Sequence, residues 1–345
     1  MTGEGQAQAL SLGSEPSQDA KRSAGGHRLA GLRDLALLPA LIALVIVGGF
    51  VSPSFLTHAN MVSILGSSAA LAFVVLAESL VIITGKFDLS LESTVGIAPA
   101  LGAMLVLPEA SSGFGIELPT SVGIAAIPLI GALIGVVNGF LIVKLRLNAF
   151  VVTLAMLIVL RGLLVGATRG GTIFEMPDPF LALATATLLG LPMSVWAAGA
   201  AFAIAAFVLR YHRLGRALYA IGGNAPAARA AGIRVERITW CVFVAAGALA
   251  SIGGLIVTGY VGAINANQGD GMIFTVFAAA VIGGIALEGG KGTMLGALSG
   301  VLLLAVVQNL LTLAQVEAFW IQAIYGSIIL LSLIVSRLTG GAEQA

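Results

Sequence analysis

The sequence predicts an all-α integral membrane protein with about ten transmembrane helices and both termini in the cytoplasm. Three observations predict this fold class: an apolar composition, a series of apolar runs of spanning length, and a one-sided distribution of lysine and arginine. Of the 345 residues, 58% are hydrophobic and only 10% are charged, whereas soluble domains carry about 25% charged residues. The composition therefore indicates a chain that lies in lipid.

The apolar runs divide the chain into one membrane domain with a tail at each end. A helix needs about 20 mostly apolar residues to cross the hydrocarbon core of a bilayer. Such runs occupy residues 34–338, which we expect to form the transmembrane domain. The tail at 1–33 is rich in Gly, Ala, Ser and Gln, which predicts disorder, and a short tail follows at 339–345. The predicted spans are 35–51, 60–84, 89–107, 119–143, 148–167, 193–210, 238–260, 271–288, 292–313 and 318–337.

Lysine and arginine fix the orientation of these spans. All 17 basic residues except Arg161 and Arg169 fall on one side of the predicted topology, and the positive-inside rule makes that side cytoplasmic. Arg169 falls on the opposite side, and we expect the Arg161 side chain, within the fifth span, to extend to the outer headgroups. One helix more or fewer after residue 90 would invert every later loop and distribute the basic residues over both sides. The residues on the cytoplasmic side are Lys21, Arg22, Arg28, Arg33, Lys86, Lys144, Arg146, Arg210, Arg213, Arg216, Arg229, Arg234, Arg237, Lys291 and Arg337.

Four polar residues in or beside the second to fourth spans are candidates for a translocation path. Glu78 would lie about two turns from the inner end of the second span, where an ionisable side chain is costly and so a candidate for function. Asp88 and Ser90 precede the third span, and Asn138 lies in the fourth. A structural alternative stands for each: Asp88 can cap the N-terminus of a helix, and Glu78 and Asn138 can hydrogen-bond within the bundle.

Glycine recurs at every fourth position in two spans. Such a stripe lets a neighbouring helix approach closely, so we expect helix packing within the bundle, with a subunit interface or a moving seam as the alternative. The similar surroundings GALIGV (131–136) and GALSGV (296–301) hint at an inverted internal repeat. The stripes are Gly131, Gly135 and Gly139, and Gly292, Gly296 and Gly300.

The longest internal loop, residues 211–237, predicts one short helix over 225–231. Its small surface, with Arg229 as the one charge, could fit a groove on a partner protein. Juxtamembrane basic clusters also contact anionic lipid headgroups, so the residues alone leave a protein surface and a lipid surface equally open. The start and stop signals are Gly222 and Gly223 as a chain break, Asn224 as the N-cap, Pro226 in the first turn and Gly232 as the C-terminal stop.

Catalytic and nucleotide-binding motifs are missing from the sequence. The segment GGIALEGGKGT (283–293) lacks the glycine spacing and the final Ser or Thr of a nucleotide-binding loop. Cys241 is the single cysteine, and His27, His58 and His212 are far apart, which disfavours a disulfide framework or a metal site. A net charge of +1 argues against a nucleic-acid partner. We therefore expect no enzyme and no cofactor, and transport energy from another protein.

Four segments together resemble the ribose-type sugar permeases of bacterial ATP-binding-cassette importers. They are TGKFDLSLES (84–93), NAFVVTLAMLIVLRG (148–162), GRALYAIGGNAPAARAAGI (215–233) and VIGGIALEGGKGT (281–293), in the family's order across residues 60–338. The resemblance implies a homodimer of permeases in the inner membrane, a cytoplasmic ATPase that binds ATP, and a periplasmic binding protein that delivers a monosaccharide or related polyol. It also implies that the third segment docks on the ATPase, through Arg216, Gly222, Gly223, Asn224, Pro226, Arg229 and Gly232.

The chain departs from the pattern of that family in three places. Lys86 and Glu92 are extra charges around the Asp-Leu-Ser triplet, Pro226 stands where Glu is common, and Met-Ile-Phe-Thr at 272–275 replaces an acidic pattern. Because of these departures, the solute and the residues that contact it stay open.

Two other classes of membrane protein remain as alternatives. A secondary carrier driven by an ion gradient could use Glu78 and Asp88 as coupling groups, although carriers commonly place such groups near the membrane midplane. An integral membrane enzyme would need a cluster of catalytic residues, and the sequence offers none.

Overall fold

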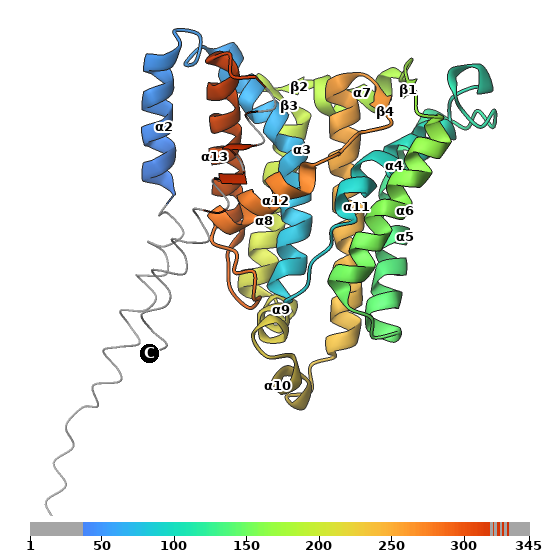
Figure 1. The fold of residues 1–345 in the computed structure, drawn as a ribbon, viewed down its shortest axis with the longest axis vertical. Helices are drawn as coiled ribbons and strands as arrows, with labels where there is room; N and C mark the ends of the chain where they lie inside the picture. Colours follow the sequence, from blue (N-terminus) through green and yellow to red (C-terminus); the bar gives the residue numbers. More distant parts are fainter. Residues whose placement is uncertain (1–36, 318–319, 321–322, 325, 328–329, 331–345) are drawn as a thin grey trace, which may run out of the picture.

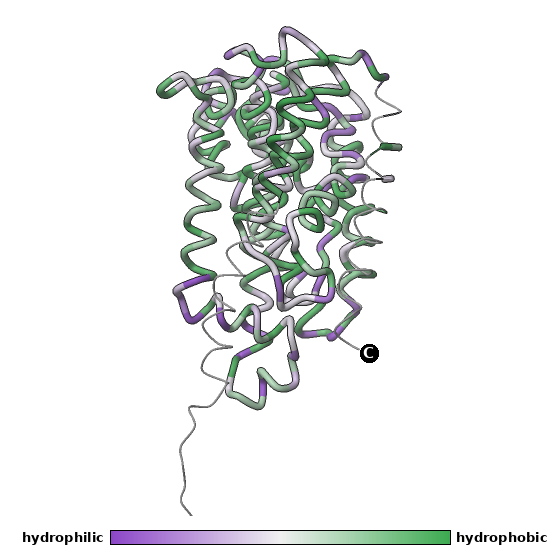
Figure 2. Tube along the Cα trace, turned by 90° about the vertical axis from the view of Figure 1, so that its left-hand side faces the viewer, coloured by the Kyte–Doolittle hydropathy of each residue, from purple (hydrophilic) through white to green (hydrophobic). Residues whose placement is uncertain are grey.

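The computed structural model describes residues 37–317, Trp320, 323–324, 326–327 and Leu330. The predicted tails at 1–33 and 339–345, and most of the predicted tenth span at 318–337, lie outside the described residues. The long helices of the described part run side by side along the long axis of the molecule (Figure 1). Figure 2 shows apolar residues over most of that length and hydrophilic stretches toward both the upper and the lower end.

Six helices of the described part are long and apolar enough to cross a membrane. They correspond to six of the ten predicted spans, which supports an all-α membrane protein. Three further predicted spans, 35–51, 89–107 and 271–288, contain shorter helices. The six are α3 (His58–Ile83), α5 (Thr120–Gly139) with its π-helical continuation η2 (Phe140–Lys144), α6 (Ala149–Thr168), α8 (Met193–Tyr211), α11 (Val235–Val261) and α13 (Met294–Leu313); the shorter ones are α2 (Leu38–Val51), α4 (Leu91–Met104) and α12 (Met272–Ile282).

Helices α4 and α12 are half-length helices continued by non-helical backbone. Their 14 and 11 residues extend about 21 and 16 Å, short of the hydrocarbon thickness of about 30 Å. The segment 84–90 precedes α4, and 266–271 precedes α12. Each predicted span therefore contains one helix that is shorter than the span: α4 lacks two residues at the start and three at the end of 89–107, and α12 ends six residues before the end of 271–288. An apolar run does not report where its backbone hydrogen bonds stop closing within a helix.

Short elements cover the end of the molecule that carries the C-terminus of α11. Strand β1 (Thr172–Ile173) pairs antiparallel with β4 (Ile264–Asn265), and β2 (Thr187–Leu188) pairs with β3 (Leu191–Pro192). Helix α7 (Asp178–Thr185) and the 3-10 turn η1 (Glu109–Ser111) complete the connections. The sequence analysis did not anticipate these elements.

Helices α9 (Arg213–Gly223) and α10 (Ala225–Ala230) form the opposite end, which we call the basic end (Figure 1). Every described lysine and arginine except Arg161 and Arg169 lies on the loops and helix ends gathered there. The prediction of a single loop helix was wrong, because Gly222 and Gly223 are the last residues of α9 rather than a break before the first helix.

The end signals predicted for the second loop helix are present in the structure. The Asn224 side chain caps α10 by accepting a hydrogen bond from the Ala227 N–H at 3.0 Å. Pro226 lies in the first turn, and Gly232 beyond the helix end has a φ of +82°.

Helix α11 lies at the centre of the bundle, and glycines let α5 cross it with near contact between backbones. A Cβ added to Gly131 would overlap the carbonyl oxygen of Gly247, and one added to Gly135 would overlap that of Phe243. At Gly139 the obstacle is the indole ring of Trp240. This glycine stripe therefore lies at a helix crossing within the chain.

The second glycine stripe lies where α13 crosses α12, but it is one residue shorter than predicted. A Cβ on Gly296 would overlap the carbonyl oxygen of Gly283, and one on Gly300 that of Ala279. Gly292 precedes α13 and has a φ of +132°. Its placement on the helix was wrong, because this backbone conformation is one that glycine adopts and other residues rarely do.

Candidate functional site

A buried polar cluster forms where the segment 84–90 meets α3, α4 and α5. We call its members, Glu78, Asp88, Ser90 and Asn138, the carboxyl cluster, and all four have no exposed surface. The backbone N–H of Asp88 donates to Glu78 Oε1 at 3.2 Å. The Ser90 hydroxyl donates to Asp88 Oδ1 at 2.6 Å, and Asn138 Nδ2 donates to the Ser90 hydroxyl oxygen at 2.7 Å. The four residues selected from the sequence as path candidates therefore lie together.

Asp88 closes a turn before α4 rather than capping the helix. Its Oδ1 also accepts the backbone N–H of Ser90 at 3.1 Å, and Ser90 is itself the N-cap residue of α4. The N–H groups of Leu91 and Glu92 bond to the carbonyls of Asp88 and Leu89. The capping interpretation was wrong in this detail, because a tight backbone turn already satisfies the first donors of the helix.

Two acceptor atoms of the carboxyl cluster lack hydrogen-bond partners among the described residues: Glu78 Oε2 and Asn138 Oδ1. A buried polar atom without a partner costs free energy, on the order of 1–3 kcal/mol. Such atoms are rare in a core that serves packing alone. The cluster therefore keeps hydrogen-bonding capacity beyond what its own fold requires.

A second cluster, the ion-pair cluster, joins the two half-length helices. Arg161 of α6 places Nη2 3.4 Å from Glu92 Oε1, in the first turn of α4, and Nη1 donates to the Gln268 carbonyl at 3.0 Å. Glu92 Oε2 accepts the backbone N–H of Ile273 at 3.2 Å, in the first turn of α12. Asp270 also faces Arg161, at 3.8 Å, and its side chain is largely exposed.

The expected extension of Arg161 to the outer headgroups was wrong. Its side chain is 17% exposed and that of Glu92 is 5% exposed, so the arginine is held inside the bundle by a carboxylate. Glu92 also lies at the positive end of the α12 helix dipole, which favours a negative charge. Sequence reasoning noted each residue separately and missed the pair, although opposite charges in two apolar runs were a usable signal.

Gln268 completes the attachment of the segment 266–271 to α4 and α11. Its Nε2 donates to the Val95 carbonyl at 2.9 Å and to Thr258 Oγ1 at 3.1 Å. The backbone of this stretch is satisfied by its own turns, from Gln268 N–H to Asn265 and from Asp270 N–H to Asn267, and by Arg161, which donates to the Gln268 carbonyl. Non-helical backbone at membrane depth is tolerated where protein groups satisfy it in this way.

The basic end is connected to the carboxyl cluster through backbone contacts. A Cβ added to Gly222 of α9 would overlap the Ile83 carbonyl oxygen at the end of α3. The same carbonyl accepts the Gly290 N–H at 2.9 Å, and the Tyr219 hydroxyl of α9 donates to the Gly292 carbonyl at 2.8 Å. Helix α9 therefore rests directly on the two segments that lead to α4 and α13.

The rest of the predicted loop surface is open. Arg216, Pro226 and Gly232 are exposed, while Arg229 bonds to Glu236 through Nη2 at 2.6 Å on the surface. Among the described residues, no group of three or more His, Cys, Asp or Glu side chains could hold a metal ion.

Half-length helices with buried charges, inside a bundle of spanning helices with one basic end, define a transport subunit embedded in a membrane. Residues 60–335 match the family model described as branched-chain amino acid transport system / permease component. The chain belongs to this permease family.

Relatives with stated functions cover most of the chain. The ribose import permease protein RbsC of Escherichia coli is 35% identical over 312 residues, which is 89% of this chain and 95% of that protein. The L-arabinose ABC transporter permease protein AraH of Azospirillum brasilense is 32% identical over 85% of this chain and 84% of its own. The autoinducer 2 import system permease protein LsrC of Klebsiella pneumoniae is 34% identical over 91% and 88%. No solved structure matches the chain.

Proposed function

We propose that this chain is the permease subunit of an ABC importer that carries a monosaccharide or related polyol across the inner membrane. The observation that carries the proposal is its similarity, over most of both chains, to import permeases named for ribose and for L-arabinose. An ATPase would supply the energy, and a periplasmic binding protein would deliver the solute. The missing nucleotide-binding motif is consistent with a separate ATPase.

The basic end would face the cytoplasm, and helices α9 and α10 would receive the ATPase. The orientation is supported by the lysines and arginines gathered at that end, as the positive-inside rule requires. The docking is supported by the exposed small surface of α10. Arg216 and Arg229 would provide the charged contacts, with Gly222, Gly223, Asn224, Pro226 and Gly232 giving the loop its shape.

The carboxyl cluster would border the translocation path. Two features support this role for Glu78, Asp88, Ser90 and Asn138: the broken helix that they fix, and the unpartnered acceptors on Glu78 and Asn138. Discontinuous helices form solute sites in many transporters, because their free backbone groups can bind a polar solute. The path itself would lie between two copies of this chain, as the family resemblance implies.

Reconstitution tests the proposal directly. The permease, its ATPase and its binding protein would be placed in liposomes, and uptake of radiolabelled ribose and arabinose measured with and without ATP. We expect uptake only with ATP and with all three proteins. A matched control carries an ATPase that binds ATP but cannot hydrolyse it.

Accumulation by the permease alone on a proton or sodium gradient would refute the proposal and favour the secondary carrier. The variant Glu78→Gln helps to distinguish the importer from the secondary carrier. In a carrier that uses Glu78 as its coupling carboxylate, removal of this charge would abolish ion-driven uptake. Thermal stabilisation of the binding protein, screened against pentoses, hexoses and polyols, identifies the solute independently of the permease.

A further inference from the structure

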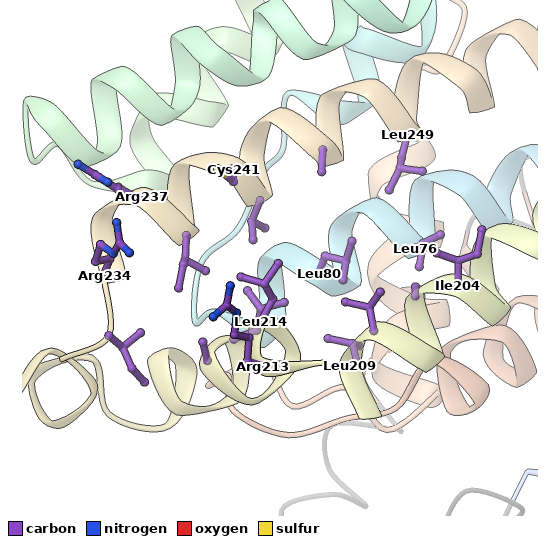
Figure 3. A pocket seen from close by; sticks show the side chains of 18 of the residues that line it. Leu76, Leu80, Ile204, Leu209, Arg213, Leu214, Arg234, Arg237, Cys241 and Leu249 are labelled. Carbon is purple, nitrogen blue, oxygen red and sulfur yellow. The ribbon is translucent and has the colours of Figure 1, made fainter. Parts of the chain in front are cut away.

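An elongated apolar groove of about 820 Å³ lies between α3, α8, α9 and the first half of α11. Figure 3 shows it from close by: leucines of α3 and α11 and Ile204 of α8 line the end away from the basic end. Ile204 is 64% exposed, so the groove opens to the side of the bundle, where a membrane protein meets lipid. Its volume is in the range of pockets that hold small ligands, about 300–1,000 Å³.

Three arginines gather at the other end of this groove, which we call the arginine groove. Arg213 comes from α9, Arg234 directly precedes α11 on the facing wall, and Arg237 lies in the first turn of α11 with its side chain directed away from Arg213 (Figure 3). All three are exposed, and within the described part of the chain none forms an ion pair with an acidic side chain. The nearby Glu236 is already engaged by Arg229.

We propose that the arginine groove binds an anionic phospholipid. The phosphate would lie between Arg213 and Arg234, with Arg237 adding positive charge nearby, and an acyl chain would follow the apolar walls toward Leu76 and Leu249. The two ends of the groove match the two parts of such a lipid. The arginines would lie at the level of the headgroups, and the apolar walls continue from them to membrane depth. Basic pockets between transmembrane helices suit anionic headgroups for this reason.

Other occupants fit the groove less well. A second copy related by a two-fold axis through the groove would present the same surface, and so bring arginine against arginine. A cytoplasmic partner could reach Arg213 and Arg237, but the apolar end lies along α3 and α8, within helices of spanning length. An anionic phospholipid satisfies both ends at once.

The position of the groove gives the bound lipid a structural consequence. Leu214 and Leu218 of α9 line it together with residues of α8 and α11. A lipid seated there would hold α9 against the bundle, so the lipid composition of the membrane would affect the helix that we expect to contact the ATPase. The lipid itself can be tested without any transport measurement, so its failure and that of the proposed function are distinguishable.

Native mass spectrometry of the purified full-length chain, incubated with equal amounts of phosphatidylglycerol and phosphatidylcholine, tests the site. We expect preferential retention of phosphatidylglycerol. Each basic residue near a membrane surface strengthens attraction of an anionic lipid by roughly fivefold, so the double variant Arg213→Gln with Arg234→Gln should weaken retention about 30-fold. Both side chains are exposed, so the variant should fold.

A matched control removes the same charge from the same end outside the groove: Lys144→Gln with Lys291→Gln, neither of which lines it, should change retention less than about twofold, because screening confines the effect of surface charge. Ala205→Trp fills the apolar part and should lower retention while leaving every arginine in place. Equal retention of both lipids, or equal losses in the two double variants, would overturn the proposal.

The single cysteine provides a reporter inside the groove. Cys241 lines it and is exposed, so its reaction with a small maleimide should slow at least fivefold in phosphatidylglycerol vesicles relative to phosphatidylcholine vesicles. An unchanged rate would contradict lipid binding. Efficient Cys241 to Cys241 cross-linking by a short bifunctional reagent would show that a second copy covers the groove, and would equally overturn the proposal.

Discussion

Removal of Arg161 should destabilise the protein through the carboxylate that it leaves behind. Arg161 Nη2 lies 3.4 Å from Glu92 Oε1, and the Glu92 side chain is 5% exposed. In Arg161→Gln this buried charge loses its cation, which costs about 3 kcal/mol of unfolding free energy. Replacing both residues, Arg161→Gln with Glu92→Gln, removes the unpaired charge and keeps an acceptor for the Ile273 N–H. The double variant should therefore lose only about 1 kcal/mol.

Unfolding of the purified permease in mixed detergent micelles, followed by circular dichroism, measures these differences. The control Arg169→Gln removes an exposed arginine at the end of the same helix and should change stability by less than about 0.5 kcal/mol. Equal losses in Arg161→Gln and Arg169→Gln would refute the reasoning. The reasoning would also be refuted if the double variant lost as much unfolding free energy as the single variants Arg161→Gln and Glu92→Gln lose together.

Three other changes address the packing, the carboxyl cluster and the loop. Gly135→Leu should prevent the close crossing of α5 and α11 and abolish a monodisperse peak in size-exclusion chromatography; Gly162→Leu, where an added Cβ meets open space, should not, and similar profiles would contradict the role of the crossing. Ser90→Ala removes a hydroxyl with two buried partners and should lower the unfolding free energy by about 1–3 kcal/mol, so an unshifted denaturation midpoint would argue against the cluster. Arg229→Ala should change stability by less than about 1 kcal/mol, because its ion pair is exposed, yet reduce co-purification with the ATPase; normal co-purification would exclude it from the docking contact.

The spanning helices could be predicted because their ends carry local signals. The run predicted at 60–84 is α3, which begins at His58 after Thr57, and the Thr57 side chain accepts the Asn60 N–H. Asn148 caps α6 in the same way, through the Val151 N–H. Hydrophobicity sets the length of such helices. Polar caps mark the starts of α3 and α6, whereas α5, α8 and α11 begin without a side-chain cap.

The half-length helices and the ion-pair cluster could not be predicted from those signals. Hydropathy alone assigns 271–288 to a span, but α12 ends at Ile282, and Gly283 and Gly284 follow. Glu92 and Arg161 are 69 residues apart, so only the folded bundle shows that they pair. Helix α9 was missed because its glycines disfavour a helix, although the buried positions Leu218 and Ile221 follow a helical spacing.

The contact between α9 and α3 bears on how movement at the basic end would reach the carboxyl cluster. Gly222 meets the Ile83 carbonyl backbone to backbone, and such close-packed atoms transmit displacement because they have no room to compress. Five residues after Ile83, within the non-helical segment 84–90, lies Asp88, whose N–H is bonded to Glu78 of α3. A shift of α9 would therefore act on a short stretch fixed at both ends, by Gly222 at one and by the carboxyl cluster at the other. We expect the stretch to rotate rather than lengthen, and Phe87, which packs edge-on against Phe277 of α12 at 5.7 Å, to carry that rotation to the second half-length helix.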